Sequence, residues 1–234
     1  MKMELLLILI GLGTLIGTPI ITNFTKRVSN NKTKKNIIKE LQESLRADLT
    51  RIDERLALAK KLKAAIDSIL KSDAPSISAL SDEDVDALVH DASHGLSFSP
   101  NISTFETYKY TGELKLLKSS KSDSLLKTIF ALYDVRYKRI FDIVKLDHRV
   151  IEQIDDYLID NAQYIGESNY SYSIKADRNT LIDLLKKEKY KQLLNMNRVV
   201  IDLMIDAFKK ARDGDDENKT GIIVLLKLLE EELN

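Results

Sequence analysis

The clearest pattern along the chain is a stripe of apolar residues in the segment 33–71, which contains neither proline nor glycine. The apolar positions recur every three or four residues, which is the spacing of one face of an α-helix. They are Ile38, Leu45, Leu49, Ile52, Leu56, Ala59, Ile66 and Leu70. The segment is therefore predicted to be one long helix. Its stripe is close to a coiled-coil seam, and we favour packing within the chain's own bundle over dimerisation.

A second segment, 122–164, shows the same pattern and also lacks glycine and proline. Its stripe includes Leu125, Ile129, Leu132, Ile140, Val144, Ile154 and Leu158. Because the two arms match in length, we expect an antiparallel helical hairpin. In that hairpin Leu49, Ile52 and Leu56 would pack against the later part of the second arm. The stretch 98–118 lies between the arms and is expected near the elbow.

The N-terminus carries an uncharged apolar run at residues 5–24. A bilayer core is spanned by about 20 apolar residues in a helix, so the run predicts a transmembrane anchor in contact with the lipid bilayer. A cleaved signal peptide is the alternative, but it requires a basic start and a shorter core. Here Lys2 is balanced by Glu4. Gly13-x-x-x-Gly17 has the spacing that lets membrane helices approach closely, which leaves a homo-oligomer open.

Basic residues follow the run and indicate its orientation. They are Lys26, Arg27, Lys32, Lys34, Lys35 and Lys39. Positive charge beside a membrane helix stays on the cytoplasmic side, so the main domain is predicted to be cytoplasmic. The same side chains can also contact anionic lipid headgroups. The chain then divides into an anchor with its flank, 1–28, and a helical bundle, 29–234.

Capping signals mark several shorter helices. Ser81-Asp-Glu-Asp84 has the form of a capping box and predicts a helix that ends near residue 93. Ser103-Thr-Phe-Glu106 has the same form, and Gly112 is placed to end that helix with a positive φ. In the C-terminal part, 177–234, we expect helices that start near residue 180, run to about 211, and resume from 222 to 233. The fold class predicted is all-α, with a transmembrane helix followed by the hairpin and bundle.

The stretch 98–118 resembles the most recurrent motif of an uncharacterised bacterial family, a domain of unknown function in single-pass inner-membrane proteins. The family motif reads approximately S-T-Y-E-x-L-K-S-S-G-x-L-x-L-I. The matching positions are Ser103, Thr104, Phe105, Glu106, Tyr108, Lys109, Gly112, Leu114, Leu116 and Leu117. Phe105 stands where tyrosine is usual, and residues 108–111 depart from the expected Leu-Lys-Ser-Ser. The resemblance implies a helical domain at the bacterial inner membrane and no known activity, cofactor or catalytic residue.

Residues in this motif have structural roles available, with two exceptions. Ser103 and Glu106 can cap, Phe105 can be buried, and Gly112 can supply the positive φ. Lys109 and Tyr110 have no evident structural role in the sequence. We therefore take Lys109 and Tyr110 as candidates for contact with a protein partner.

The sequence contains few signals of a catalytic site. His90 and His94 are four apart on one predicted helix, as in zinc hydrolases, but Asp91 replaces the glutamate base and no third ligand is evident. The chain has no cysteine, no phosphate-binding glycine loop and no nucleophile motif. Thirty-six basic and 36 acidic residues cancel, so nucleic acid is not an expected partner. We predict no enzyme, no cofactor and no metal.

Two function classes remain open. The first is a membrane-anchored interaction or scaffold module. The second is a sensory or ligand-binding module coupled to the membrane, in which a change in the bundle is passed to the anchor. Buried polar residues around a cavity would favour sensing, whereas a dry core with an exposed apolar patch would favour scaffolding. A hydrolase that uses His90 and His94 is a distant third.

Overall fold

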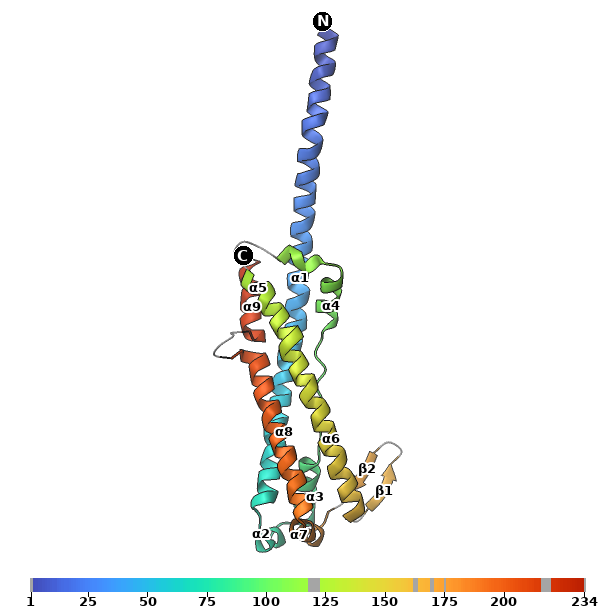
Figure 1. Ribbon diagram of the computed structural model, residues 1–234, viewed down its shortest axis with the longest axis vertical. Coiled ribbons are helices and arrows are strands. Elements are labelled where there is room, and N and C mark those ends of the chain that lie inside the picture. Colours follow the sequence, from blue (N-terminus) through green and yellow to red (C-terminus); the bar gives the residue numbers. More distant parts are fainter. Residues whose placement is uncertain are drawn as a thin grey trace.

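The computed structural model describes residues 2–117, 123–161, 164–168, 171–174, 176–215 and 220–233. For residues 2–25, 27, 123, 164–168 and 171–174 it describes the backbone alone. The described chain is predominantly helical, as predicted. Long helices lie side by side, and the first part of α1 extends beyond them as a single rod (Figure 1).

Helix α1, Lys2–Lys71, contains both the predicted anchor and the predicted first arm. In the arm the predicted stripe is buried, with Ile38, Leu45, Ile52 and Ile66 all fully inaccessible. The side chains of the predicted anchor, residues 5–24, lie outside the described residues. In the part of the chain whose side chains the structure describes, no helix is both long and apolar enough to cross a membrane.

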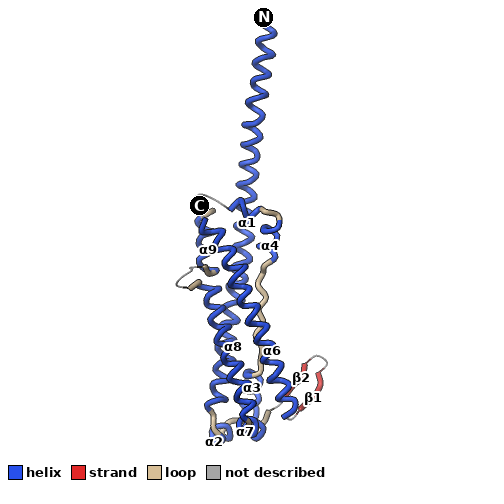
Figure 2. Tube along the Cα trace, viewed as in Figure 1, coloured by secondary structure: helices blue, strands red, loops and turns tan. Residues whose placement is uncertain are grey.

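After α1 the chain turns at the far end of the bundle and returns. Helices α2, Ala74–Ser78, and α3, Asp82–Ala92, make the turn. An extended segment then runs back along the bundle to α4, Ser103–Tyr110, and the short 3-10 helix η1, Glu113–Leu117 (Figure 2). The motif therefore lies at the end of the bundle from which the first part of α1 emerges (Figure 1).

The second arm is one continuous rod made of three parts. Helix α5, Asp123–Phe130, passes into a π-helix, η2, Ala131–Tyr137, and then into α6, Lys138–Asn161. A β-hairpin follows, with β1, Tyr164–Ser168, paired antiparallel to β2, Ser171–Ile174. The chain ends with α7, Arg178–Lys186, α8, Glu188–Asp213, and α9, Ile222–Glu231, close to the expected bounds.

The antiparallel partner of α1 is α8, as a ladder of ion pairs shows. Asp53, Lys63 and Asp67 of α1 pair in that order with Arg212, Asp202 and Arg198 of α8, at 2.7, 2.5 and 3.5 Å. The numbers rise along one helix and fall along the other. Beyond α8, Lys34 pairs with Glu232 just after α9, so the C-terminal end returns along the start of the first arm.

The predicted antiparallel hairpin between 33–71 and 122–164 is wrong, because these two arms are parallel. The Ser44 hydroxyl lies beside that of Tyr133, and Asp48 is hydrogen-bonded to Tyr137. The residue numbers therefore increase in the same direction along both arms, which is the arrangement of parallel helices. The cause is the connection: because the segment after α3 returns along the bundle, the second arm starts again at the end where the motif lies. Leu49, Ile52 and Leu56 consequently do not face the end of the second arm.

The returning segment, residues 93–102, is named the strap. Leu96, Phe98 and Pro100 are buried while Ser97 and Ser99 are exposed, which is the period of two of an extended chain. Phe98 meets the rings of Tyr137 and Phe208 edge-on, at centroid distances of 6.1 and 5.4 Å. The strap is thus wedged into the bundle between the two parallel arms and α8.

The strap pairs with no strand among the described residues, so side chains satisfy its backbone. Asp147 accepts the Leu96 N–H at 2.6 Å, and Asp48 accepts the Asn101 N–H at 2.9 Å. Ser44 donates to the Asn101 carbonyl at 3.0 Å. Buried backbone groups must find partners, and these polar side chains supply them in place of a sheet.

Candidate functional site

Helix α4 begins without the capping box that the sequence predicts. Its N-cap is Ile102, which makes no side-chain cap, and the Ser103 hydroxyl instead donates to Asn101 Oδ1 at 2.8 Å. The capping box at Ser81 and Asp84 is confirmed, with both hydrogen bonds present. The predicted cap at residue 103 fails because the chain arrives at α4 already in a helical turn at Ile102.

The end of α4 agrees with the prediction. Gly112 has φ +74°, and a Cβ built there would meet no atom within 4 Å. The glycine is therefore required by backbone conformation and not by crowding. It directs the chain into η1, where Leu114 and Leu117 are buried.

Two aromatic contacts fix α4 on the π-helix and on α1. The Phe105 ring is 1% exposed and stacks on Tyr133 with centroids 4.3 Å apart. The Tyr108 hydroxyl donates to Glu40 of α1 at 2.6 Å. Partial burial, with this carboxylate beside the hydroxyl, raises the pKa of Tyr108 to about 12. Helix α4 is thus held rigidly from two sides.

Lys109 has a structural role, so the prediction that it has none is wrong. Its ammonium pairs with Asp134 of the π-helix at 3.0 Å. It also lies 5.0 Å from the centroid of the Phe105 ring and 5.6 Å from that of Phe130. The hydrogen bond to Asp134 raises the pKa of Lys109. Tyr110, by contrast, is 81% exposed and remains a candidate for partner contact.

A pocket of about 390 Å³ opens beside these contacts. Its lining joins the start of α4 to the π-helix and the first turn of α6 through Ile102, Phe105, Glu106, Tyr133, Asp134, Lys138 and Phe141. We name these residues, together with Lys109, Tyr110 and Phe130, the motif surface. Within the described structure neither Glu106 nor Lys138 makes an ion pair, so these two opposite charges lie at the pocket beside Asp134, which pairs with Lys109.

The π-helix was not predicted, because its apolar spacing looks like that of an α-helix. It places Tyr133 and Tyr137 on the inner side, where Tyr137 donates to Asp48 at 2.8 Å. Burial raises the pKa of Asp48, opposed by the Asn101 N–H and by Tyr137. Single stretches of π-helix are frequent at functional sites, and this one lines the pocket of the motif surface with Tyr133 and Asp134.

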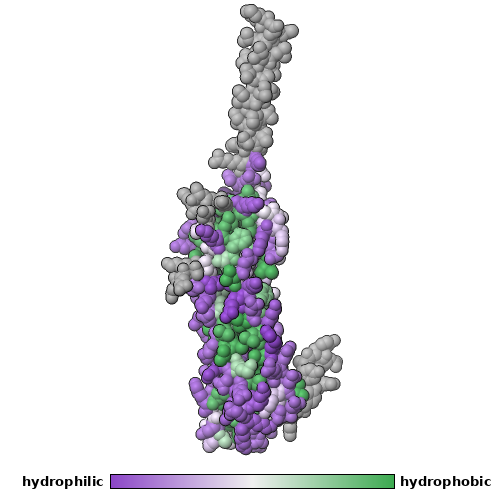
Figure 3. Space-filling view, in the orientation of Figure 1, coloured by the Kyte–Doolittle hydropathy of each residue, from purple (hydrophilic) through white to green (hydrophobic). Residues whose placement is uncertain are grey.

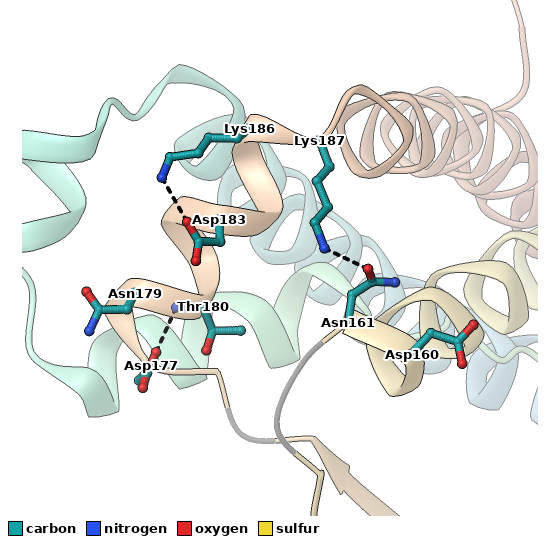
Figure 4. A pocket seen from close by; sticks show the side chains of 8 residues that line it. All are labelled: Asp160, Asn161, Asp177, Asn179, Thr180, Asp183, Lys186 and Lys187. Atoms are coloured by element: carbon teal, nitrogen blue, oxygen red, sulfur yellow. Dashed lines mark hydrogen bonds and ion pairs between the residues drawn. The ribbon is translucent and has the colours of Figure 1, made fainter.

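A second pocket, of about 870 Å³, lies around α7 (Figure 4). Both of its lysines have partners: Lys186 pairs with Asp183 at 2.8 Å and Lys187 with Asn161 at 2.7 Å. Asp177 accepts the Thr180 N–H at 2.7 Å as the N-cap of α7. These side chains are mostly exposed, so the arrangement is one of helix caps and surface pairs.

The paired histidines do not form a recognisable catalytic group. The His90 and His94 rings lie 5.7 Å apart, centroid to centroid, and the His90 side chain is 71% exposed. Among the described residues no third ligand-bearing side chain joins them in a metal-binding cluster. Nothing in this geometry supports a hydrolase.

One face of the bundle carries an apolar patch at mid-height (Figure 3). The exposed apolar residues of α6 and α8 are Leu146, Ile159, Met196, Val199 and Leu203. Met196, Val199 and Leu203 recur at helical spacing, which the sequence did not single out. This patch is separate from the motif surface, whose residues come from α4, the π-helix and the start of α6.

The described fold is a helical bundle with an extended strap between its helices and an exposed tyrosine, Tyr110, on α4. Comparison of the chain with protein-family models, with curated proteins and with solved structures found no match.

Proposed function

We propose that the protein is a membrane-anchored helical interaction module that binds a protein partner at the motif surface. Residues 5–24 would cross the bacterial inner membrane, and the basic residues after them would keep the bundle in the cytoplasm. The resemblance of residues 98–118 to a membrane-protein motif supports the location. The observation that carries the docking proposal is Tyr110, which is 81% exposed on a helix held rigidly from two sides.

The chemistry of the surface suits a protein partner. Tyrosine is enriched at protein interfaces because its ring covers a large area and its hydroxyl stays polar. The adjacent pocket can accept an apolar side chain between Phe105 and Phe141, with Glu106 and Lys138 available for polar contacts at the rim. Interfaces commonly combine an apolar centre with such a polar rim.

A sensory module remains the second candidate, because polar side chains are buried in the bundle. Asp48, Asp147 and Asn197 are each fully inaccessible. Helix α1 also runs without a break from the proposed anchor into the bundle, so a change among these groups has a direct route to the membrane.

Photo-crosslinking in intact cells tests the docking proposal. A photoreactive amino acid at Tyr110 should give a discrete crosslinked product in the membrane fraction. The same amino acid at Lys60, on the exposed side of α1, measures background, and at Met196 it probes the α6–α8 patch. No product above background at Tyr110, or a product only at Met196, would show that the docking surface is wrong.

A substitution separates binding from folding. Because the side chain is so exposed, Tyr110→Ala should leave the melting temperature within about 1 °C of wild type. It should still weaken capture of the partner found by crosslinking at least tenfold. An equal capture by wild type and variant contradicts the assigned role of Tyr110.

A further inference from the structure

A buried carboxyl and a buried amide hold the start of the strap from two different helices. Asp147 of α6 accepts the Leu96 N–H at 2.6 Å. Asn197 of α8 donates to the Ala92 carbonyl at 2.8 Å. Both side chains are fully inaccessible to solvent. The turn at residues 92–96 therefore joins α3, α6 and α8 through polar contacts, in addition to the buried side chains of Ala92 and Leu96.

Each of these two side chains also has one oxygen without a partner. Asp147 Oδ1 and Asn197 Oδ1 are buried, and neither receives a hydrogen bond in the described part of the chain. Two buried acceptors that flank one turn lack a donor. A proton on the Asp147 carboxyl would remove a buried charge and convert one acceptor into a donor.

The turn cannot move away from the carboxyl without breaking this contact. A Cβ added at Gly95 would lie 3.5 Å from Asp147 Oδ2 and 4.0 Å from the His148 ring. The strap continues from here to Asn101, held by Asp48, and to Ile102, which lines the motif surface. A change at Asp147 can therefore be passed along the backbone of the strap to the motif surface.

We propose that Asp147 is a proton-linked latch for the strap. The latch is closed and dry when the carboxyl is protonated, and when the carboxyl is ionised the turn at Leu96 loosens so that water solvates the buried charge and its unpartnered Oδ1. The latch is a property of the bundle and does not depend on the identity of a partner.

The direction of the pH dependence follows from the burial of the Asp147 carboxyl. Burial raises the pKa of Asp147 from 3.8 to about 6, although the Leu96 N–H and His148 oppose the rise. A carboxyl whose pKa is higher in the closed state stabilises that state when protonated, so closure is favoured at low pH and is lost as pH rises toward 6. In the open state the carboxyl is solvated and returns to its ordinary pKa of 3.8. Each pH unit between these two values is worth a factor of ten, so the opening equilibrium should rise roughly a hundredfold.

Other titratable or charged side chains belong to the elements that pack at the turn. On α6 His148 follows Asp147, and at the start of the strap lies His94. On α3 Asp91 pairs with Lys61 of α1 at 2.8 Å, and on α8 Arg198 pairs with Asp67 at 3.5 Å. The two histidines are ionisable side chains close to the turn, so each has its own control.

Hydrogen exchange of the full chain in phospholipid nanodiscs tests the latch. Exchange in peptides that cover residues 92–99 is followed from pH 4 to pH 7.5 and corrected for the intrinsic pH dependence of amide exchange. The wild type should show the roughly hundredfold rise in opening. Asp147→Asn should be flat, because an amide accepts the Leu96 N–H and cannot ionise. His148→Gln and His94→Gln should keep the rise.

Two outcomes overturn the latch. One is corrected exchange in the wild type that does not change with pH, and the other is an Asp147→Asn protein that keeps the same slope. If the variant does not fold, the carbon chemical shift of the Asp147 carboxyl in the wild type decides instead. A titration midpoint below pH 5 would mean that the Asp147 carboxyl is not held protonated in the closed state, and the proposal would be wrong.

Discussion

Two tyrosines one turn apart in the π-helix should differ sharply in what their hydroxyls contribute to stability. Tyr137 is fully buried and donates to Asp48 at 2.8 Å. Tyr133 is 5% exposed, and its hydroxyl has no hydrogen bond of normal geometry in the described structure, although Ser44 lies beside it. Tyr137→Phe and Tyr133→Phe remove the same atom from nearly the same environment and so form a matched pair.

The magnitude follows from the partner of each hydroxyl. A hydrogen bond to a charged group contributes about 1.5–3 kcal/mol net, and its loss leaves a buried carboxylate with fewer donors. We therefore expect Tyr137→Phe to lower the free energy of unfolding by about 2 kcal/mol. Tyr133→Phe removes a hydroxyl that already lacks a partner and should change it by less than about 0.5 kcal/mol. At about 2–4 °C per kcal/mol, Tyr137→Phe should melt about 4–8 °C lower.

The difference should depend on pH in a defined direction. The Tyr137 hydrogen bond lowers the pKa of Asp48, since it favours the ionised carboxyl, while burial raises it. Tyr137→Phe should therefore cost more at pH 7 than at pH 4, because the Asp48 carboxyl is more ionised at the higher pH. Tyr133→Phe should show no such dependence.

The assay is urea unfolding of the full chain in nanodiscs, followed by circular dichroism at 222 nm, at both pH values. Equal dependence of the unfolding free energy on urea in all proteins is the control, because it shows that the extent of unfolding is unchanged. Were Tyr133→Phe to lose as much stability as Tyr137→Phe, the assignment of the Asp48 network as the support of the π-helix would be refuted.

Further expectations concern backbone, caps and topology. Gly112→Ala should lower the free energy of unfolding by roughly 1–2 kcal/mol, because alanine resists the positive φ and nothing else opposes its methyl group. Ser81→Ala should cost about 1 kcal/mol as the loss of a true cap, whereas Ser103→Ala should cost less than half of that. Both are measured by the same unfolding assay, and the reverse order would contradict the capping assignment. An alkaline phosphatase fused after Asn234 should be inactive in intact cells, and activity would place the bundle outside the cytoplasm.

Periodicity predicted the helices well because burial along a single face leaves a direct trace in the sequence. The stripe that begins at Ile38 is buried along α1, and the bounds of α7, α8 and α9 follow caps and glycines such as Asp177 and Gly214. The positive φ of Gly112 was predicted on the same local grounds. Each of these features depends on residues within a few positions of one another.

The direction of the second arm could not be predicted in this way. A helical stripe is the same whether its partner runs parallel or antiparallel, so the choice depended on the path of the connection. That path depends on the strap, which is stabilised by side chains distant in sequence, namely Asp48 and Asp147. In the sequence both look like solvated acids on charged helices, and only the tertiary fold shows that they replace the missing strand partner.

The role of Lys109 was missed for a related reason. Besides Phe105 within the motif, its partners are Asp134 and Phe130, which lie outside it, and a motif-based interpretation considers only the residues inside the motif. Tyr110, immediately after it, was chosen because the sequence shows no structural role for it, and its side chain is exposed. Within the motif, the sequence thus indicates which residues are buried by local helix geometry but not which are held by a distant element.

The docking and latch proposals meet at the strap and can still be tested apart. Ile102 ends the strap and lines the pocket of the motif surface, while Asp147 acts at the other end, on Leu96. An absence of crosslinking at Tyr110 would refute the docking proposal but would not affect the pH dependence of hydrogen exchange in the strap. Hydrogen exchange in the strap that does not change with pH would refute the latch but would not affect the crosslinking result. If both hold, crosslinking at Tyr110 should change between pH 5 and pH 7 in the wild type and not in Asp147→Asn, which would make the module a docking site whose shape responds to protons.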